Sequence, residues 1–149
     1  MKVNIWSDVR CPFCYIGKRQ FEKALEQFPH KDQISVVWKS FELDPYLKTR
    51  TDLSTLDYLA ESKMISKAQA EEMTQYATQA GTKLGLQFDF EKAIVANSLK
   101  AHCLIQFAQT KGLGNAAQEQ LFSSHFSAGE DIDDEGVLIR IGTTIGLDP

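Results

Sequence analysis

A Cys-Pro-Phe-Cys motif at residues 11–14 stands where a predicted strand gives way to a predicted helix. Apolar residues alternate with polar ones over residues 3–9, which is typical of a strand leading into a loop. From residue 16 to residue 28 apolar residues recur at helical spacing, so Cys11 is expected at or just before the first turn of a helix. Pro12 suits the first helical position, because the N–H that proline lacks has no partner there.

This placement predicts a redox-active dithiol. A thiol at a helix N-terminus faces unpaired backbone N–H groups and the positive end of the helix dipole, and both favour the thiolate. Cysteines so placed in Cys-x-x-Cys motifs have pKa values of roughly 3.5–7.5. We expect Cys11 to attack a substrate disulfide as the nucleophile and Cys14 to resolve the mixed disulfide that forms.

Two other interpretations of the cysteine pair carry less weight. A zinc site needs two further ligands, but the sequence has no second Cys-x-x-Cys and its three histidines, His30, His102 and His125, are scattered, so no metal is predicted. Free cysteines are often buried, so both thiols could also be inert core residues. The position between strand and helix favours redox chemistry over both.

Side chains around the motif are candidates for substrate binding. The candidates are Trp6, Pro12, Phe13 and Tyr15. Trp6 and Tyr15 are expected either to wall a substrate groove or to pack between strand and helix. Arg10 would favour a thiolate at the motif and Asp8 would oppose it. For His102 and His125, local packing and hydrogen bonding are favoured over a role near the thiols.

Composition argues against nucleic-acid and membrane partners and favours a cytoplasmic location. The chain has 16 Lys and Arg against 20 Asp and Glu, a formal net charge of −4, which argues against a nucleic-acid partner. No apolar run approaches the roughly 20 residues that cross a bilayer, so no membrane partner is expected. The N-terminus lacks the apolar core of a signal peptide, so we predict a cytoplasmic protein. In that compartment a Cys-x-x-Cys motif indicates redox or metal chemistry.

The remaining pattern predicts a β-α-β unit followed by helices. A second strand is expected over residues 34–41, parallel to the first because a helix joins them. Helices are expected over residues 54–61, 66–84, 91–111, 116–126 and 133–144, the last capped by Asp133.

Several separated stretches resemble one family. They are residues 5–18 around the motif, Phe41 to Pro45, Ala96 to Ser98 with Ala101-His102, Phe126 to Leu138, and Ile145 to Asp148. Together they resemble DsbA-like thioredoxin-fold proteins of the FrnE branch, relatives of 2-hydroxychromene-2-carboxylate isomerases and kappa-class glutathione transferases. The resemblance implies an α/β fold. Residues 1–45 would form the N-terminal part of a thioredoxin-like domain and residues 46–149 an α-helical insertion domain.

The sequence departs from that family at its C-terminal end. Members continue for roughly another half-length, with a cis-proline loop, two further strands and a closing helix. We therefore expect an incomplete sheet with exposed strand edges. Such a chain is expected to form a homo-oligomer, to swap elements or to rest on its helical part.

The resemblance implies a protein-disulfide oxidoreductase or isomerase that acts on protein or small-molecule disulfides. It would need no cofactor beyond its own redox-active disulfide, with glutathione as a candidate co-substrate. One alternative is a glutathione-dependent isomerase or transferase, but those relatives commonly carry Ser in place of the first cysteine and lack the second. Because both Cys11 and Cys14 are present, the oxidoreductase is favoured. The other alternative is an inactive fragment that serves as an interaction module.

Overall fold

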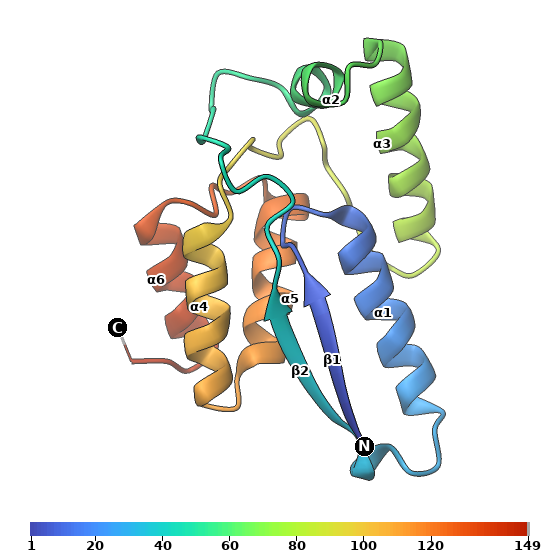
Figure 1. Cartoon of the computed structure of the whole chain (residues 1–149), viewed down its shortest axis with the longest axis vertical. Coiled ribbons are helices and arrows are strands. Elements are labelled where there is room, and N and C mark those ends of the chain that lie inside the picture. The colour runs from blue at the N-terminus through green and yellow to red at the C-terminus, as the bar shows by residue number, and fades with distance from the viewer. Residues whose placement is uncertain (149) are drawn as a thin grey trace.

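The computed structural model describes residues 1–148. It is a mixed α/β structure with a two-stranded parallel sheet and six α-helices among these residues (Figure 1). The elements are β1 (Lys2–Ser7), α1 (Pro12–Glu26), a short 3-10 turn (Lys31–Gln33), β2 (Ser35–Ser40), α2 (Thr55–Lys63), α3 (Lys67–Thr82), α4 (Leu99–Thr110), α5 (Gly114–Ser123), a π-helical turn (Ser124–Ala128) and α6 (Glu135–Thr144).

The predicted β-α-β unit is confirmed. β1 and β2 pair in parallel from Lys2 opposite Ser35 to Ser7 opposite Ser40. Strand β2 is one residue shorter at each end than the range predicted from alternation. Trp38 is the buried residue of that strand. It lies on the face of the sheet that is turned toward the core, in agreement with the alternating pattern.

Helices from the second half of the chain cover the face of the sheet that carries Trp38. α4 and α5 pack against β2, and α6 packs against α4 and α5 (Figure 1). One hydrophobic cluster joins Ile5 and Trp38 of the sheet to Ile105, Leu121 and Ile141 of those helices. The core thus contains residues from both sides of the predicted boundary at residue 45, and the division into two domains stays a prediction.

A second cluster of apolar side chains joins α1 to α5 and the π-helical turn. Tyr15 stacks on Phe122 with ring centroids 4.6 Å apart and planes 6° from parallel. Phe126 and Phe88 complete the cluster beside Ile16. Because aromatic pairs of this kind bury large areas, they fix α1 against the helical half of the molecule.

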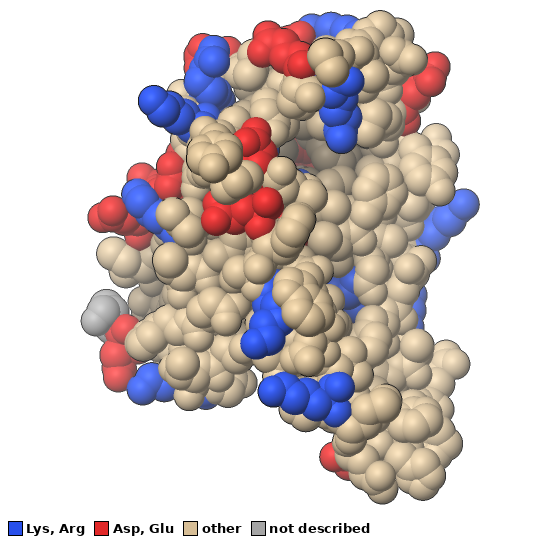
Figure 2. All heavy atoms as spheres, in the orientation of Figure 1, with Lys and Arg blue, Asp and Glu red and all other residues tan. Residues whose placement is uncertain are grey.

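Helices α2 and α3 pack against each other with steeply crossed axes at the far end of the molecule from the N-terminus (Figure 1). Each begins at a serine whose hydroxyl accepts a backbone N–H, Ser54 from Asp57 and Ser66 from Gln69. Both starts match the prediction, and α3 ends at Thr82, two residues earlier than predicted. Charged side chains of both signs surround α2 on the face shown in Figure 2. None of the helices among residues 1–148 is long and apolar enough to span a bilayer.

Residues 91–98 are not helical, contrary to prediction. Their polar groups bond instead to distant segments: Val95 bridges Arg50, and the amide of Asn97 donates to the carbonyl of Leu47. Helix α4 therefore begins only at Leu99. The N–H of Leu99 donates a hydrogen bond to the side-chain oxygen of Asn97. Tertiary hydrogen bonds override local helical propensity in this stretch.

The cap of the last helix is also one residue from its predicted position. Asp134 caps α6 by accepting the N–H of Val137. Asp133 accepts a hydrogen bond from the Thr49 hydroxyl at 2.7 Å and so serves a tertiary contact. Helix α5 likewise starts two residues before the predicted position, at Gly114, and gives way to the π-helical turn at Ser124.

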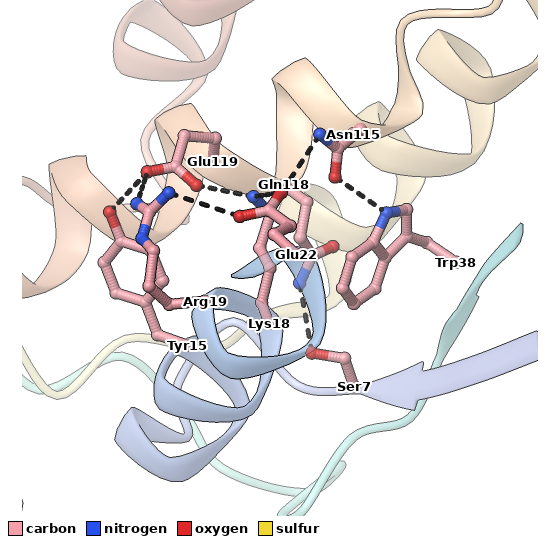
Figure 3. Close-up of polar contacts among 9 residues, drawn as sticks. All are labelled: Ser7, Tyr15, Lys18, Arg19, Glu22, Trp38, Asn115, Gln118 and Glu119. Atoms are coloured by element: carbon pink, nitrogen blue, oxygen red, sulfur yellow. Dashed lines mark hydrogen bonds and ion pairs between the residues drawn. The ribbon is translucent and has the colours of Figure 1, made fainter. Parts of the chain in front are cut away.

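A compact ion-pair network holds α1 to α5 (Figure 3). The Lys18 side chain is only 1% exposed, and its Nζ lies 2.6 Å from carboxylate oxygens of both Glu22 and Glu119. Glu119 also accepts hydrogen bonds from Arg19 and from the Tyr15 hydroxyl. Burial opposes the charge of Glu119, but the bonds from Lys18 and Tyr15 prevail and lower its pKa.

Replacing Glu119 by Gln is expected to destabilise the fold by about 2 kcal/mol at neutral pH, because it leaves Lys18 with a single carboxylate partner. Since the folded-state pKa of Glu119 is lowered, this contribution is present above the unfolded-state value of about 4.3 and is lost as the pH falls below it. Urea denaturation of the wild-type protein and of Glu119→Gln, at pH 7 and at pH 3, measures this contribution to the free energy of unfolding.

Glu135→Gln is the matched control. Its carboxylate pairs with Lys100 at 3.3 Å, but the Glu135 side chain is 78% exposed, so a change below about 0.5 kcal/mol is expected. Equal losses in the two variants would contradict a special contribution of the α1–α5 network.

Candidate active site

The Cys-Pro-Phe-Cys motif opens α1 as predicted. Pro12 is the first helical residue and Cys11 is the N-cap, with extended backbone angles. The N–H of Cys11 donates to the carbonyl of Asp8 at 3.1 Å, and the N–H of Cys14 donates to the carbonyl of Cys11 at 3.0 Å. This turn places both sulfur atoms at the positive end of the α1 dipole.

The two cysteines are free thiols and half-buried, and they titrate as a pair. A hydrogen bond from the Cys11 thiol lowers the pKa of Cys14 to about 6. The same bond, together with burial, raises the pKa of Cys11. The reduced site therefore carries one negative charge at neutral pH. Cys11 and Cys14 share one proton, and the Cys11 thiolate expected from the sequence stays a prediction.

Backbone N–H groups stabilise a thiolate on Cys11 as well. The N–H groups of Phe13 and Cys14 both act to lower the pKa of Cys11. When the shared proton passes from Cys11 to Cys14, the charge moves to a sulfur that faces the start of the helix. Either sulfur can therefore hold the charge, which a thiol–disulfide exchange site requires at different steps.

A buried carboxylate lies directly before the motif. Asp8 is 1% exposed and accepts N–H groups from Leu43 at 2.8 Å and from Arg10 at 3.2 Å. Its Oδ1 also lies 3.3 Å from Nε2 of His102, and because an ionised carboxylate only accepts, Nε2 carries the hydrogen. Burial opposes the charge, but these bonds outweigh it and lower the pKa of Asp8.

Cys11 opens onto a cavity of about 480 Å³. One wall is the start of α1, from Arg10 to Phe13, and the others come from α2, α3, the 90–95 segment and the π-helical turn. A hollow is visible at this place in Figure 2, beneath α2. The lining is mainly apolar, with charged side chains at Arg10, Asp44 and Lys63, so the cavity suits an apolar group that carries a polar or charged one.

Comparisons with known proteins agree with this geometry. Residues 2–149 match the DSBA-like thioredoxin domain family. The chain belongs to that family.

Individual relatives support the assignment. The crystal structure of a probable DsbA oxidoreductase, SCO1869 from Streptomyces coelicolor, superposes with a TM-score of 0.89 at 32% identity, over 99% of this chain and 64% of that one. The uncharacterized protein YwbO of Bacillus subtilis (strain 168) is 26% identical over 148 residues, which are 98% of this chain and 66% of YwbO. The cytosolic disulfide reductase DsbM from Pseudomonas aeruginosa, in its structure with GSH, shares the fold at 16% identity with a TM-score of 0.65, over 99% of this chain and 66% of DsbM.

The chain spans about two thirds of the length of these relatives. Membership in the DsbA-like family confirms the fold class expected from the sequence. The FrnE branch within that family stays a prediction.

The structure separates the four candidate substrate-binding residues of this DsbA-like chain. Pro12 and Phe13 line the cavity beside Cys11. Tyr15 lies one turn further along α1 and packs in the aromatic cluster, where burial and the Glu119 carboxylate raise its pKa. Trp6 is 63% exposed, on strand β1. Neither Trp6 nor Tyr15 lies on the wall of the cavity, so the two do not form one groove with the motif.

Sequence reasoning missed His125 as part of the site. It lies in the π-helical turn, 5% exposed, and lines the cavity that Cys11 opens onto. Burial lowers its pKa to about 4, with the charge of Arg10 adding to the effect, so the imidazole is neutral at physiological pH. Its Nδ1 is buried without a hydrogen-bond partner among the described residues. Only the folded chain brings it to the motif, because 110 residues separate it from the second cysteine.

The third cysteine lies apart from the site. Cys103 is exposed on α4. It is not among the residues that line the cavity.

The reduced dithiol is expected to alkylate with a pH midpoint near 6, because the thiolate is lost only as the pH falls through the lowered pKa of Cys14. Iodoacetamide kinetics from pH 4 to pH 9 measure this midpoint. The Cys103→Ser background removes the exposed third thiol from the signal. A midpoint at the free-thiol value of about 8.5 would contradict activation of the pair.

Proposed function

We propose that this chain is the catalytic part of a thiol–disulfide oxidoreductase that uses Cys11 and Cys14. The observation that carries the proposal is the activated thiol pair at the start of α1, of which Cys11 opens onto the cavity. Membership in the DsbA-like family supports it. The substrates are disulfides of proteins or small molecules.

The reaction consists of two successive thiol–disulfide exchanges. The Cys11 thiolate attacks one sulfur of the substrate disulfide, the S–S bond breaks, and the leaving thiolate takes a proton. The Cys14 thiolate then attacks Sγ of Cys11 and releases the second substrate thiolate. The substrate is reduced by two electrons, and the protein is oxidised to the Cys11–Cys14 disulfide. The reverse sequence oxidises a dithiol substrate.

A thiol reductant must reset the oxidised protein after it reduces a substrate. Glutathione is a reductant of suitable chemistry, and two molecules would reduce the Cys11–Cys14 disulfide through a mixed disulfide. Two cationic side chains, Arg10 and Lys63, line the cavity against one anionic side chain, Asp44, and this excess of positive charge favours an anionic thiol of this kind. We place this chemistry in the cytoplasm, where thiol pools are reducing.

The second candidate function is a glutathione-dependent isomerase or transferase. The mainly apolar cavity with its two cationic side chains would suit an apolar substrate that carries a carboxylate. Such a reaction needs one activated thiol or hydroxyl and no resolving cysteine. The two functions therefore differ in their need for Cys14.

Cys14→Ser is expected to trap a mixed disulfide between Cys11 and the substrate, with one substrate thiol released and no further turnover, because the resolving sulfur is gone. Mass spectrometry after incubation with a peptide disulfide detects the adduct. Cys11→Ser should form no adduct.

Cys103→Ser serves as the control and is expected to turn over normally, since this cysteine lies outside the cavity lining. If Cys14→Ser keeps full activity with glutathione and an isomerisable substrate, the second candidate function is the correct one.

A further inference from the structure

Arg10, the residue before the dithiol, is an arginine without a carboxylate partner. The chain has four arginines, and the other three, Arg19, Arg50 and Arg140, each form an ion pair with an Asp or Glu. Among residues 1–148 no such ion pair reaches the Arg10 guanidinium, and the bond from Arg10 to Asp8 comes from its backbone N–H. A half-buried guanidinium without a counter-ion is available to bind an anion.

The Arg10 guanidinium is nevertheless held in place. It lies over the ring of Tyr58 on α2, with Cζ 5.1 Å from the ring centroid. The Tyr58 hydroxyl donates to Oδ2 of Asp44 at 3.1 Å, so the one carboxylate in the cavity lining already has a partner. The planar fork of N–H groups on a guanidinium matches the two oxygens of a carboxylate. Arg10 thus presents this fork in a fixed position.

The cavity that holds Arg10 and Cys11 has the size of a small-molecule site. Its volume of about 480 Å³ lies within the range of about 300–1,000 Å³ that such sites have. Its walls come from several elements, so a small molecule fits inside and a folded protein does not enter. His125 in the same lining is 5% exposed, and its Nδ1 has no hydrogen-bond partner in the described part of the chain. A second polar group of the wall thus lacks a protein partner.

The cation and the reactive sulfur belong to neighbouring residues. Consecutive Cα atoms are about 3.8 Å apart, and both side chains line the same cavity. A ligand that places a carboxylate on Arg10 and a sulfur on Cys11 therefore needs only a short chain between the two groups. Disulfides of mercapto-carboxylic acids have this form.

We propose that Arg10 is the carboxylate anchor of a small-molecule site at Cys11, so that the dithiol prefers low-molecular-weight disulfides with a carboxylate a short chain away from the sulfur. The inference rests on the proposed thiol–disulfide function and names its substrate class. Cys11 attacks the sulfur of the anchored half, the other half leaves as a thiolate and takes a proton, and Cys14 then releases the anchored thiol. The substrate gains two electrons, and the protein becomes the Cys11–Cys14 disulfide.

Two disulfides that differ in charge test the proposal. Dithiodipropionate carries a carboxylate at each end, and hydroxyethyl disulfide is neutral. The reduced protein, in the Cys103→Ser background, supplies both electrons in a single turnover, and acid quenching followed by thiol labelling gives the rate constant per molar disulfide. In Arg10→Gln the constant for dithiodipropionate is expected to fall about tenfold, the effect of a hydrogen bond to a charged group. The constant for hydroxyethyl disulfide should change less than about twofold.

Two further variants vary the charge and shape of the site. Arg10→Lys keeps the positive charge but loses the planar fork, so we expect a loss of about threefold with dithiodipropionate. Asp44→Asn removes the negative charge of the lining and is expected to raise the same constant about twofold. Neither change should alter the constant for the neutral disulfide.

Lys111→Gln is the matched control. Lys111 follows α4, and its Nζ lies 5.9 Å from the centroid of the Phe107 ring, so it is also a cation over an aromatic side chain. It is not among the residues that line the cavity. Its replacement removes the same charge from the protein and should leave both rate constants unchanged, which separates a local anchor from long-range attraction.

Suberate gives a second readout that needs no disulfide chemistry. It has the length and the two carboxylates of dithiodipropionate but carbon atoms in place of the sulfurs. Suberate is expected to slow alkylation of the wild-type dithiol by neutral iodoacetamide, because it occupies the cavity onto which Cys11 opens. This protection should be lost in Arg10→Gln.

Equal losses with the two disulfides in Arg10→Gln, or no loss with either, would overturn the proposal. If Arg10→Gln does not fold, Arg10→Lys and Asp44→Asn carry the test, and unchanged constants for dithiodipropionate in both variants overturn it. A wild-type protein that reduces neither disulfide but is protected by suberate would overturn the proposed function and keep the anion site.

Discussion

The structure around the thiols depends on one buried carboxylate. Asp8 accepts N–H groups from Arg10, two residues ahead, and from Leu43 after strand β2, and it contacts His102 on α4. Three segments distant in sequence are thereby tied to the turn that presents the motif. An ionised carboxylate at 1% exposure is stable only with such partners, so the turn, the loop after β2 and α4 must be in place together. The same charge disfavours a thiolate at Cys14, and the site compensates with dipoles.

The reactive end of α1 also depends on how α1 is anchored further along. Tyr15 stacks on Phe122, and Lys18 pairs with Glu119, so both anchors reach α5. A buried ion pair of this kind is a weak source of net stability but penalises any arrangement that breaks it. It therefore specifies how α1 packs on α5, the helix from which Gln118 donates a hydrogen bond to Ser7 at the end of β1.

Local sequence signals predicted the elements that local physics governs. The strand-to-helix junction at residues 11–14 was confirmed because alternation, helical spacing and the proline all favour it. The starts of α2 and α3 were confirmed at Ser54 and Ser66, since a serine cap satisfies orphan N–H groups without help from elsewhere. Residues 91–98 were wrongly predicted as helix, because their bonds go to segments 45 to 50 residues away that no local pattern shows.

The sequence by itself determined the family, the parallel β-α-β unit and the pair of cysteines at a helix start, because each follows from residues close together in the chain. Tertiary structure alone decided which residues surround those thiols. It brought His125 and the walls of α2 and α3 to Cys11, removed Tyr15 from the cavity, and set Gln118 against Ser7. The physical reason is that cavities, buried hydrogen bonds and shared protons depend on contacts across about a hundred residues, and such contacts leave no periodic mark in the sequence.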